Sequence, residues 1–132
     1  MPILLDTSVV VKWIASEPQS DVAITYQGQH IIAPDLLRAE LAQALYKKVK
    51  KRELTALDAL AGQAEAEELI VFVPATHMSQ RALELSLELN HAAGDCFFLA
   101  LAERTEISFV TADLAFVETC RGTPYEHHVR AL

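Results

Sequence analysis

The stretch Pro2–Ser8, with the sequence PILLDTS, decides the fold that we expect for this chain. An apolar run ends at an acid and two hydroxyl residues, and a helical pattern follows at once. A short run that is apolar without strict alternation is typical of a strand covered on both faces. The stretch therefore predicts the first strand of a parallel sheet, with Asp6 at its carboxyl end.

Short apolar runs and longer helical patterns alternate along the rest of the chain. Together with Pro2–Leu5, strands are expected at Ile31–Ala33, Ile70–Val73, Ser108–Val110 and Glu126–Val129. Helices are expected at Ser8–Ser16, Gln19–Gln27, Asp35–Lys51, Ala56–Leu69, Ser79–Asn90, Asp95–Arg104 and Leu114–Cys120. Such alternation requires right-handed crossovers, which make the strands parallel. We expect an α/β protein, a three-layer α/β/α sandwich with a central, mainly parallel sheet of four or five strands, formed by residues 1–132 as one domain.

The composition is that of a folded globular protein. Of the 132 residues, 52% are hydrophobic and 22% are charged, which sets intrinsic disorder aside. The longest purely apolar run, Cys96–Ala102, is far shorter than the roughly 20 residues that span a bilayer, and no targeting segment is visible. We therefore expect a cytoplasmic protein without a membrane partner, in which Cys96 and Cys120 stay reduced.

The net charge of −7 argues against a nucleic-acid partner, because polyphosphates are normally bound by an excess of Lys and Arg. A local exception ends the helix expected from Asp35. Its basic residues are Lys47, Lys48, Lys50, Lys51 and Arg52. Interaction with the dipole of that helix explains the cluster, and so does contact with an RNA backbone. Both interpretations stay open.

Two acids directly follow expected strands. Asp6 follows the first strand, and Asp113 follows the fourth after a short turn. Ligands of open parallel sheets bind beyond the carboxyl ends of the strands. Capping of the next helix explains either acid alone. Each acid, however, has a hydroxyl residue two positions away, Ser8 and Thr111, that can orient a ligating carboxylate.

Two further acids lie on helix faces that should be apolar. Glu40 shares a face with Leu37 and Ala44 at helical spacing, and Asp95 precedes the fully apolar helix segment Cys96–Ala102. A carboxylate in such a place is costly unless something pairs with it, and no basic residue lies at helical spacing on either face. The simpler explanations are that Glu40 reaches water at the edge of its stripe and that Asp95 interacts with the helix dipole.

Considered together, Asp6, Glu40, Asp95 and Asp113 predict a divalent-metal site. Carboxylates that share a cleft repel one another and raise one another's pKa values. A hard divalent cation relieves that repulsion, and all-oxygen ligation suits Mg²⁺ or Mn²⁺ better than zinc. Two such cations would also offset the four acidic charges, which weakens the objection from net charge.

The motifs of this chain, in their order, resemble those of PIN-domain nucleases. They are LDTSV at Leu5–Val9, PDLLRAE at Pro34–Glu40, GDC at Gly94–Cys96 running into LALA at Leu99–Ala102, and VTAD at Val110–Asp113. Within that family the chain looks most like the VapC-type toxins of bacterial toxin–antitoxin pairs. Ala112 stands where family members often have a polar residue.

The resemblance implies a metal-dependent endoribonuclease whose catalytic and metal-binding residues are Asp6, Glu40, Asp95 and Asp113. Asp6 and Asp95 are the expected direct ligands of Mg²⁺ or Mn²⁺, and Glu40 and Asp113 bind it directly or through water. The resemblance also implies an RNA substrate, a homodimer, and a cognate antitoxin protein that forms larger assemblies with it and contacts DNA as a repressor.

Other functions stay open beside this one. The chain could be a PIN-like RNA-processing nuclease without a toxin role, or a partner-binding module with negligible catalysis. A haloacid-dehalogenase-like phosphatase also has an Asp after its first strand, but it needs a second Asp where this chain has Ser8. The RNA that is cut and the number of metals are not specified by these motifs.

Overall fold

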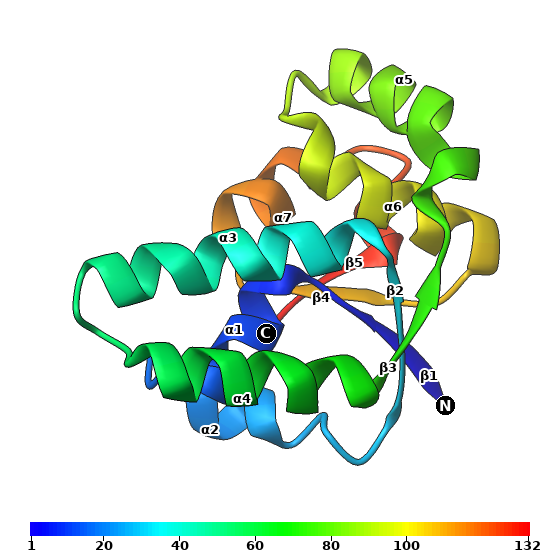
Figure 1. Ribbon diagram of the computed structural model, residues 1–132. Coiled ribbons are helices and arrows are strands. Elements are labelled where there is room, and N and C mark those ends of the chain that lie inside the picture. Colours follow the sequence, from blue (N-terminus) through cyan, green and yellow to red (C-terminus); the bar gives the residue numbers. More distant parts are fainter.

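The short apolar segments of the chain assemble into one sheet (Figure 1). In the computed structural model, which describes residues 1–132, the strands are β1 (Pro2–Leu5), β2 (His30–Pro34), β3 (Ile70–Val73), β4 (Phe109–Thr111) and β5 (Val129–Ala131). All neighbouring strands are parallel, in the order β3-β2-β1-β4-β5. The α/β fold with a parallel sheet that the sequence predicts is therefore confirmed.

Helices cover both faces of this sheet. They are α1 (Thr7–Ile14), α2 (Ser20–Ile24), α3 (Leu36–Lys50), α4 (Ala56–Glu68), α5 (Ser79–Leu89), α6 (Ala93–Thr105) and α7 (Leu114–Cys120), with short 3₁₀-helices η1 (Ala75–Met78) and η2 (Glu126–His128). The connections that contain α1 to α4 run along the sheet in one direction, and those with α5 to α7 run in the other. Right-handed crossovers therefore place the two groups on opposite faces.

The edge that matters for function lies between the central strand β1 and its neighbour β4. The chain leaves β1 toward β2 and β3 and returns on the other side of β1 as β4. The amide of Asp6 donates to the carbonyl of Val110 at 2.9 Å, so the two strands end at the same level. Such a reversal of strand order is where open α/β sheets bind ligands.

The core holds this edge in place. Three aromatic rings run from the sheet into α6 and α7: Phe98 stacks on Phe109 at 5.3 Å between ring centroids, and Phe109 meets Phe116 edge-on at 6.1 Å. On the other face, the side chains of Leu37, Leu41 and Leu45 are buried, as the helical stripe predicts. Both cysteines are free and buried. None of the helices combines the length and the apolarity needed to cross a bilayer.

The prediction of a strand at Glu126–Val129 is wrong. Residues Glu126–His128 form the 3₁₀-helix η2, and the last strand begins only at Val129. The reason lies in the partner strand: β4 is three residues long and pairs in register with Val129–Ala131, so residues before Val129 have no strand to pair with. The amide of His128 bonds instead to the carbonyl of Tyr125 at 3.0 Å. The helix expected at Gln19–Gln27 is also shorter, because Gln19 has a left-handed backbone and only Ser20–Ile24 is helical.

Candidate metal centre

The four acids that the sequence singles out meet at the carboxyl edge of the sheet, although each comes from a different element. Asp6 joins β1 to α1, Glu40 lies in α3, Asp95 lies in the first turn of α6, and Asp113 precedes α7. The negative charge of Asp6 acts on both Glu40 and Asp95, and that of Asp113 acts on Asp95. The four acids therefore form one cluster in which charge effects connect Glu40 to Asp6, Asp6 to Asp95 and Asp95 to Asp113.

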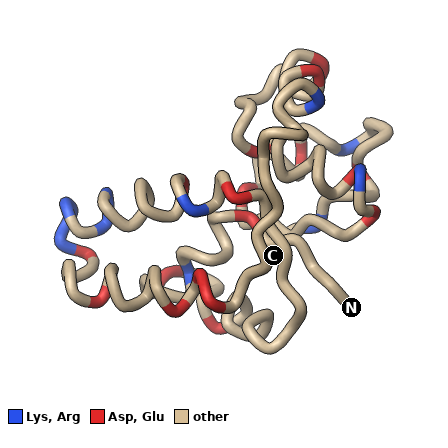
Figure 2. The backbone as a smooth tube through the Cα atoms, turned by 45° about the vertical axis from the view of Figure 1, so that its right-hand side comes forward, with Lys and Arg blue, Asp and Glu red and all other residues tan.

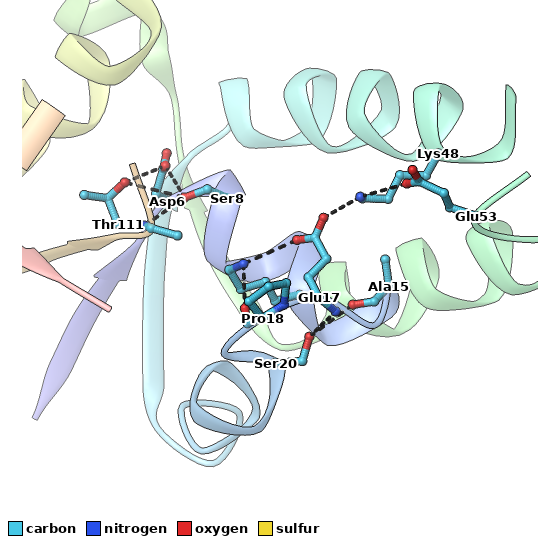
Figure 3. A network of polar contacts seen from close by, with 11 residues as sticks. Asp6, Ser8, Ala15, Glu17, Pro18, Ser20, Lys48, Glu53 and Thr111 are labelled. Carbon is cyan, nitrogen blue, oxygen red and sulfur yellow. Dashed lines mark hydrogen bonds and ion pairs between the residues drawn. The ribbon is translucent and has the colours of Figure 1, made fainter. Parts of the chain in front are cut away.

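Asp6 is the most buried member of this cluster, with a residue exposure of 5%. The hydroxyls of Ser8 and Thr111 both donate to its Oδ2, at 2.6 and 2.9 Å (Figure 3). These hydroxyls are fixed in turn, because Ser8 Oγ accepts from the amide of Ala112 at 3.1 Å and Thr111 Oγ1 from the amide of Asp113 at 3.0 Å. Asp6 makes no capping hydrogen bond to α1, so capping does not explain it. Burial raises the pKa of Asp6, and the two hydroxyls oppose that rise only in part.

Glu40 approaches the same cluster from α3. Its Oε1 accepts a hydrogen bond of 2.7 Å from the hydroxyl of Thr7, a residue that the sequence analysis did not assign to the site. Burial and the nearby charge of Asp6 raise the pKa of Glu40, while Thr7 opposes them. A Cβ at Gly94 would lie 2.9 Å from Oε2 of Glu40, so the absence of a side chain at Gly94 allows α6 to approach this carboxylate closely. The interpretation that Glu40 simply reaches water is therefore wrong.

Asp95 is bound by a histidine that the sequence analysis missed. Nε2 of His91 lies 2.7 Å from Oδ2 of Asp95. The expectation that no basic residue pairs with the helical acids is wrong, because His91 is four residues before Asp95 but belongs to the loop that precedes α6. A comparison of residues along one helix face leaves out a residue of the preceding loop. The spacing of four between His91 and Asp95 is nevertheless a signal in the sequence that could have identified the pair. Burial raises the pKa of Asp95 to about 7, the charges of Asp6 and Asp113 add to the rise, and His91 counteracts it.

Asp113 has two roles in the structure. Its Oδ1 accepts a hydrogen bond of 3.2 Å from the amide of Phe116, so the interpretation of Asp113 as a helix cap is correct. Potential ligand atoms of Asp113, Asp95 and His91 also lie within 4.8 Å of one another. A capping carboxylate keeps free electron pairs that can reach a cation, so the two roles are compatible.

The donors of this cluster fit a divalent cation. None of the ion pairs in the structure joins a Lys or Arg to Asp6, Glu40, Asp95 or Asp113. The acids therefore face one another with a single imidazole as their only basic neighbour, which is costly when they are ionised. Carboxylate oxygens suit Mg²⁺ and Mn²⁺, and an imidazole nitrogen favours the softer Mn²⁺ of the two.

The basic cluster lies far from these acids, at the opposite end of α3. In Figure 2 the blue segments gather where α3 turns into α4, and red segments gather where α3 begins beside the sheet. Three of the five basic residues, Lys47, Lys48 and Lys51, line a groove of about 410 Å³ between α1 and α3, whereas Lys50 and Arg52 do not. The structure thus separates the five basic residues, which are nearly consecutive in the sequence, into three that line the groove and two that do not.

Comparison with known proteins places these observations in a family. The model of the PIN domain family matches residues 3–122. Among solved structures, the crystal structure of PAE2754 from Pyrobaculum aerophilum has a TM-score of 0.72 and 17% sequence identity, over 93% of this chain and 90% of that chain. At this identity the likeness extends to the fold alone. No curated protein matches the sequence.

Proposed function

Because this chain belongs to the PIN-domain family, whose members are typically metal-dependent nucleases, we propose that it is an endoribonuclease that hydrolyses RNA phosphodiester bonds with Mg²⁺ or Mn²⁺. The observation that carries the proposal is the cluster of Asp6, Glu40, Asp95 and Asp113, which has no Lys or Arg to neutralise it. Such a cluster is unfavourable by itself and becomes favourable around a divalent cation.

Each residue of the cluster has a proposed role that follows from its contacts. Asp6 and Asp95 are the direct ligands, and Asp113 completes the set directly or through water. Ser8 and Thr111 orient Asp6, and His91 orients Asp95 or adds a nitrogen ligand. When bound, a divalent cation would lower the pKa of a water molecule and stabilise negative charge on the phosphate.

Glu40 is the residue that we propose as proton acceptor. Thr7 binds its Oε1 at 2.7 Å, which leaves Oε2 as the atom available to a proton from the attacking water. The raised pKa of Glu40, caused first by burial and then by Asp6, brings it closer to the operating pH, where a general base is most effective.

Cleavage of RNA with and without the cation tests this function. Pools of tRNA, rRNA and mRNA are incubated with the purified protein in Mg²⁺, in Mn²⁺ and in excess EDTA, beside the Asp95→Asn variant. We expect cleavage only with a divalent cation, and a loss of roughly 1000-fold or more in Asp95→Asn because a ligand is removed. Circular dichroism of the variant checks that the fold is intact. Equal cleavage in EDTA, or full activity of Asp95→Asn, would overturn the assignment. A cation-dependent rise in melting temperature without any cleavage would instead favour a binding module.

We further propose that the nuclease is a VapC-type toxin that acts as a homodimer and is neutralised by a cognate antitoxin. The support is the order of its four motifs over the whole chain, together with the exposed leucines Leu83 and Leu87, one helical turn apart on α5, which suit contact with a second copy. Induced expression in a bacterial host tests the toxin role, with growth arrest expected for the wild type and none for Asp95→Asn. Light scattering after size exclusion tests the dimer. Normal growth with full nuclease activity would indicate RNA processing instead.

A further inference from the structure

The groove between α1 and α3 ends beside the residues that hold Asp6, although none of the four acids lines it. Ser8, whose hydroxyl donates to Asp6, and Ala112, whose amide donates to Ser8, line one end of it. Lys51 and Glu53 line it beside the turn into α4. An extended molecule that follows the groove would therefore pass from the acidic cluster to the lysines without leaving the surface.

Helix α3 carries an acidic residue of the cluster and basic residues of the groove on one side. Glu40, Ala44, Lys47 and Lys51 follow one another at spacings of three and four residues, so they share a face. Lys48 lies beside Lys47 on the same groove wall. At a rise of about 1.5 Å per residue, Lys47 and Lys51 lie on the order of 11 and 17 Å along the helix from Glu40, which is the length of a few nucleotides. On α1, the residues Ser8 and Lys12 are likewise one turn apart.

The lysines of the groove differ in what they already bind. Glu17, in the loop between α1 and α2, pairs with Lys48 (Figure 3). It also lies 3.5 Å from Lys12. Lys12 also donates to the carbonyl of Pro18 at 2.8 Å. Lys47 and Lys51 are exposed and have no acidic partner. Although burial opposes it, Lys48 and Lys12 lower the pKa of Glu17, so its carboxylate stays negative at neutral pH. Glu53 also lines the groove and lies 3.3 Å from Lys48. The groove thus already holds two carboxylates among its lysines.

We propose that this groove binds the backbone of the RNA next to the scissile bond, with Lys47 and Lys51 contacting its phosphates and Glu17 acting as an internal counter-ion that a phosphate displaces from Lys48. The inference rests on the proposed function and specifies the path of its substrate. Charge complementarity supports the choice of a polyanion, because a phosphate and the Glu17 carboxylate are both acceptors of charge-assisted hydrogen bonds from lysine. Lys50 and Arg52 lie outside the groove and take no part in this contact.

Binding measurements with matched pairs of lysine variants test the path. The probe is a fluorescent single-stranded oligouridine, and the parent protein is Asp95→Asn in EDTA, so that cleavage does not interfere. The test variant adds Lys47→Gln and Lys51→Gln to this parent. The control variant adds Lys50→Gln and Arg52→Gln, which removes the same charge. Anisotropy titrations at several salt concentrations give affinity and salt dependence. Each lost phosphate contact should reduce the slope of log affinity against log salt by about 0.7. If the contact contributes nothing at about 1 M salt, its loss weakens binding at about 0.1 M salt by about 5-fold.

The expected results differ clearly between the two pairs. The groove pair should weaken binding by roughly 25-fold and the slope should fall by about 1.4, while the control pair should change affinity less than about 2-fold. Equal losses in both pairs would mean that the cluster acts only through its overall charge, and the path would be wrong. No binding of the parent protein at low salt would also overturn it.

A separate variant tests the counter-ion. Glu17→Gln keeps the size of the side chain and removes one of the two carboxylates that pair with Lys48, while Glu53 stays 3.3 Å from it. Binding should therefore tighten by about 5-fold and the salt slope should steepen by about 0.7. Unchanged or weaker binding, with an unchanged melting temperature, would refute the role of Glu17.

These assays need no catalysis, so failure of the nuclease assay with intact groove binding contradicts only the proposed function. Cleavage that is insensitive to Lys47 and Lys51 contradicts only the path.

Discussion

At its N-terminal end, helix α3 carries Glu40 half-buried beside Asp6 and Thr7, whereas at its C-terminal end it carries Lys47 and Lys50 in open solvent. The acidic end is held by short hydrogen bonds, and its carboxyl groups have raised pKa values because burial and mutual repulsion disfavour the charged form. Lys47 and Lys50 have neither constraint. Burial and charged neighbours therefore make the acidic end of α3 a rigid ligand set and leave Lys47 free to adapt to a phosphate, as we propose.

The largest expected effect is at the most buried acid. Asp6→Asn keeps an oxygen that can accept from Ser8 and Thr111 but removes the negative charge that binds the cation. We expect nuclease activity to fall by roughly 1000-fold or more, while Lys51→Gln at the basic end should lower it only about 5-fold in kcat/KM. Single-turnover cleavage in Mg²⁺ measures both. Losses of similar size in the two variants would remove the distinction between the two ends of α3.

A smaller loss is expected from the hydroxyl that orients Asp6. Thr111→Val preserves shape and removes the 2.9 Å hydrogen bond to Oδ2, so the carboxylate is less well held and its pKa rises further. We expect metal affinity to fall by roughly 10- to 100-fold, as for other residues that orient a ligand. Titration of Mn²⁺ by calorimetry measures it. Thr119→Val on α7, whose hydroxyl bonds only to the carbonyl of Ala115, is the control and should leave affinity unchanged.

The pH dependence of stability separates the acidic end from the rest of the surface. Asp95 has a folded pKa of about 7 against an ordinary value of 3.8, because of burial and then the charge of Asp6. The folded state therefore holds this proton more tightly than the unfolded state. The stability that Asp95 contributes is complete below about pH 4 and is lost as the pH rises to about 7, and the raised pKa values of Asp6 and Glu40 act in the same direction.

Thermal unfolding in EDTA and in Mg²⁺ measures this effect. In EDTA at about pH 8, Asp95→Asn should melt roughly 2 to 5 °C higher than the wild type, and the difference should nearly vanish at about pH 4. Mg²⁺ should raise the melting temperature of the wild type more at about pH 8 than at about pH 5, because protons compete with the cation. A wild type that is more stable than Asp95→Asn in EDTA at high pH would contradict the mutual repulsion of the acids.

The smallest effect on stability and activity is expected at Gly94, where the backbone of α6 approaches Glu40. Gly94→Ala would place a Cβ 2.9 Å from Oε2 of Glu40, and the carboxylate must move by a few tenths of an ångström. Since the end of a flexible side chain can shift, stability should change by less than about 1 kcal/mol. Nuclease activity should still fall about 2- to 5-fold because the position of Glu40, the proposed proton acceptor, matters for the reaction. Gly28→Ala, which would meet nothing within 4 Å, provides the comparison in the same single-turnover assay.

Much of the fold could be predicted because its signals are local. The strands Pro2–Leu5 and Ile70–Val73 and the helix Leu114–Cys120 were predicted with the bounds that the structure has. An apolar run without alternation, or a helical period, is a property of neighbouring residues. The predicted bounds of the last strand are wrong because its extent depends on β4, which lies about 20 residues earlier and provides its only hydrogen-bonding partner strand.

By itself, the sequence determined which residues carry the charge and at which ends of strands and helices they occur, since these follow from order along the chain. Only the tertiary structure decided which charges meet. It pairs His91 with Asp95 and Thr7 with Glu40, and it separates Lys47 and Lys51 from Lys50 and Arg52. The physical reason is that interactions between charges depend on distance and burial, and for residues far apart in the chain both are set by how the helices pack on the sheet.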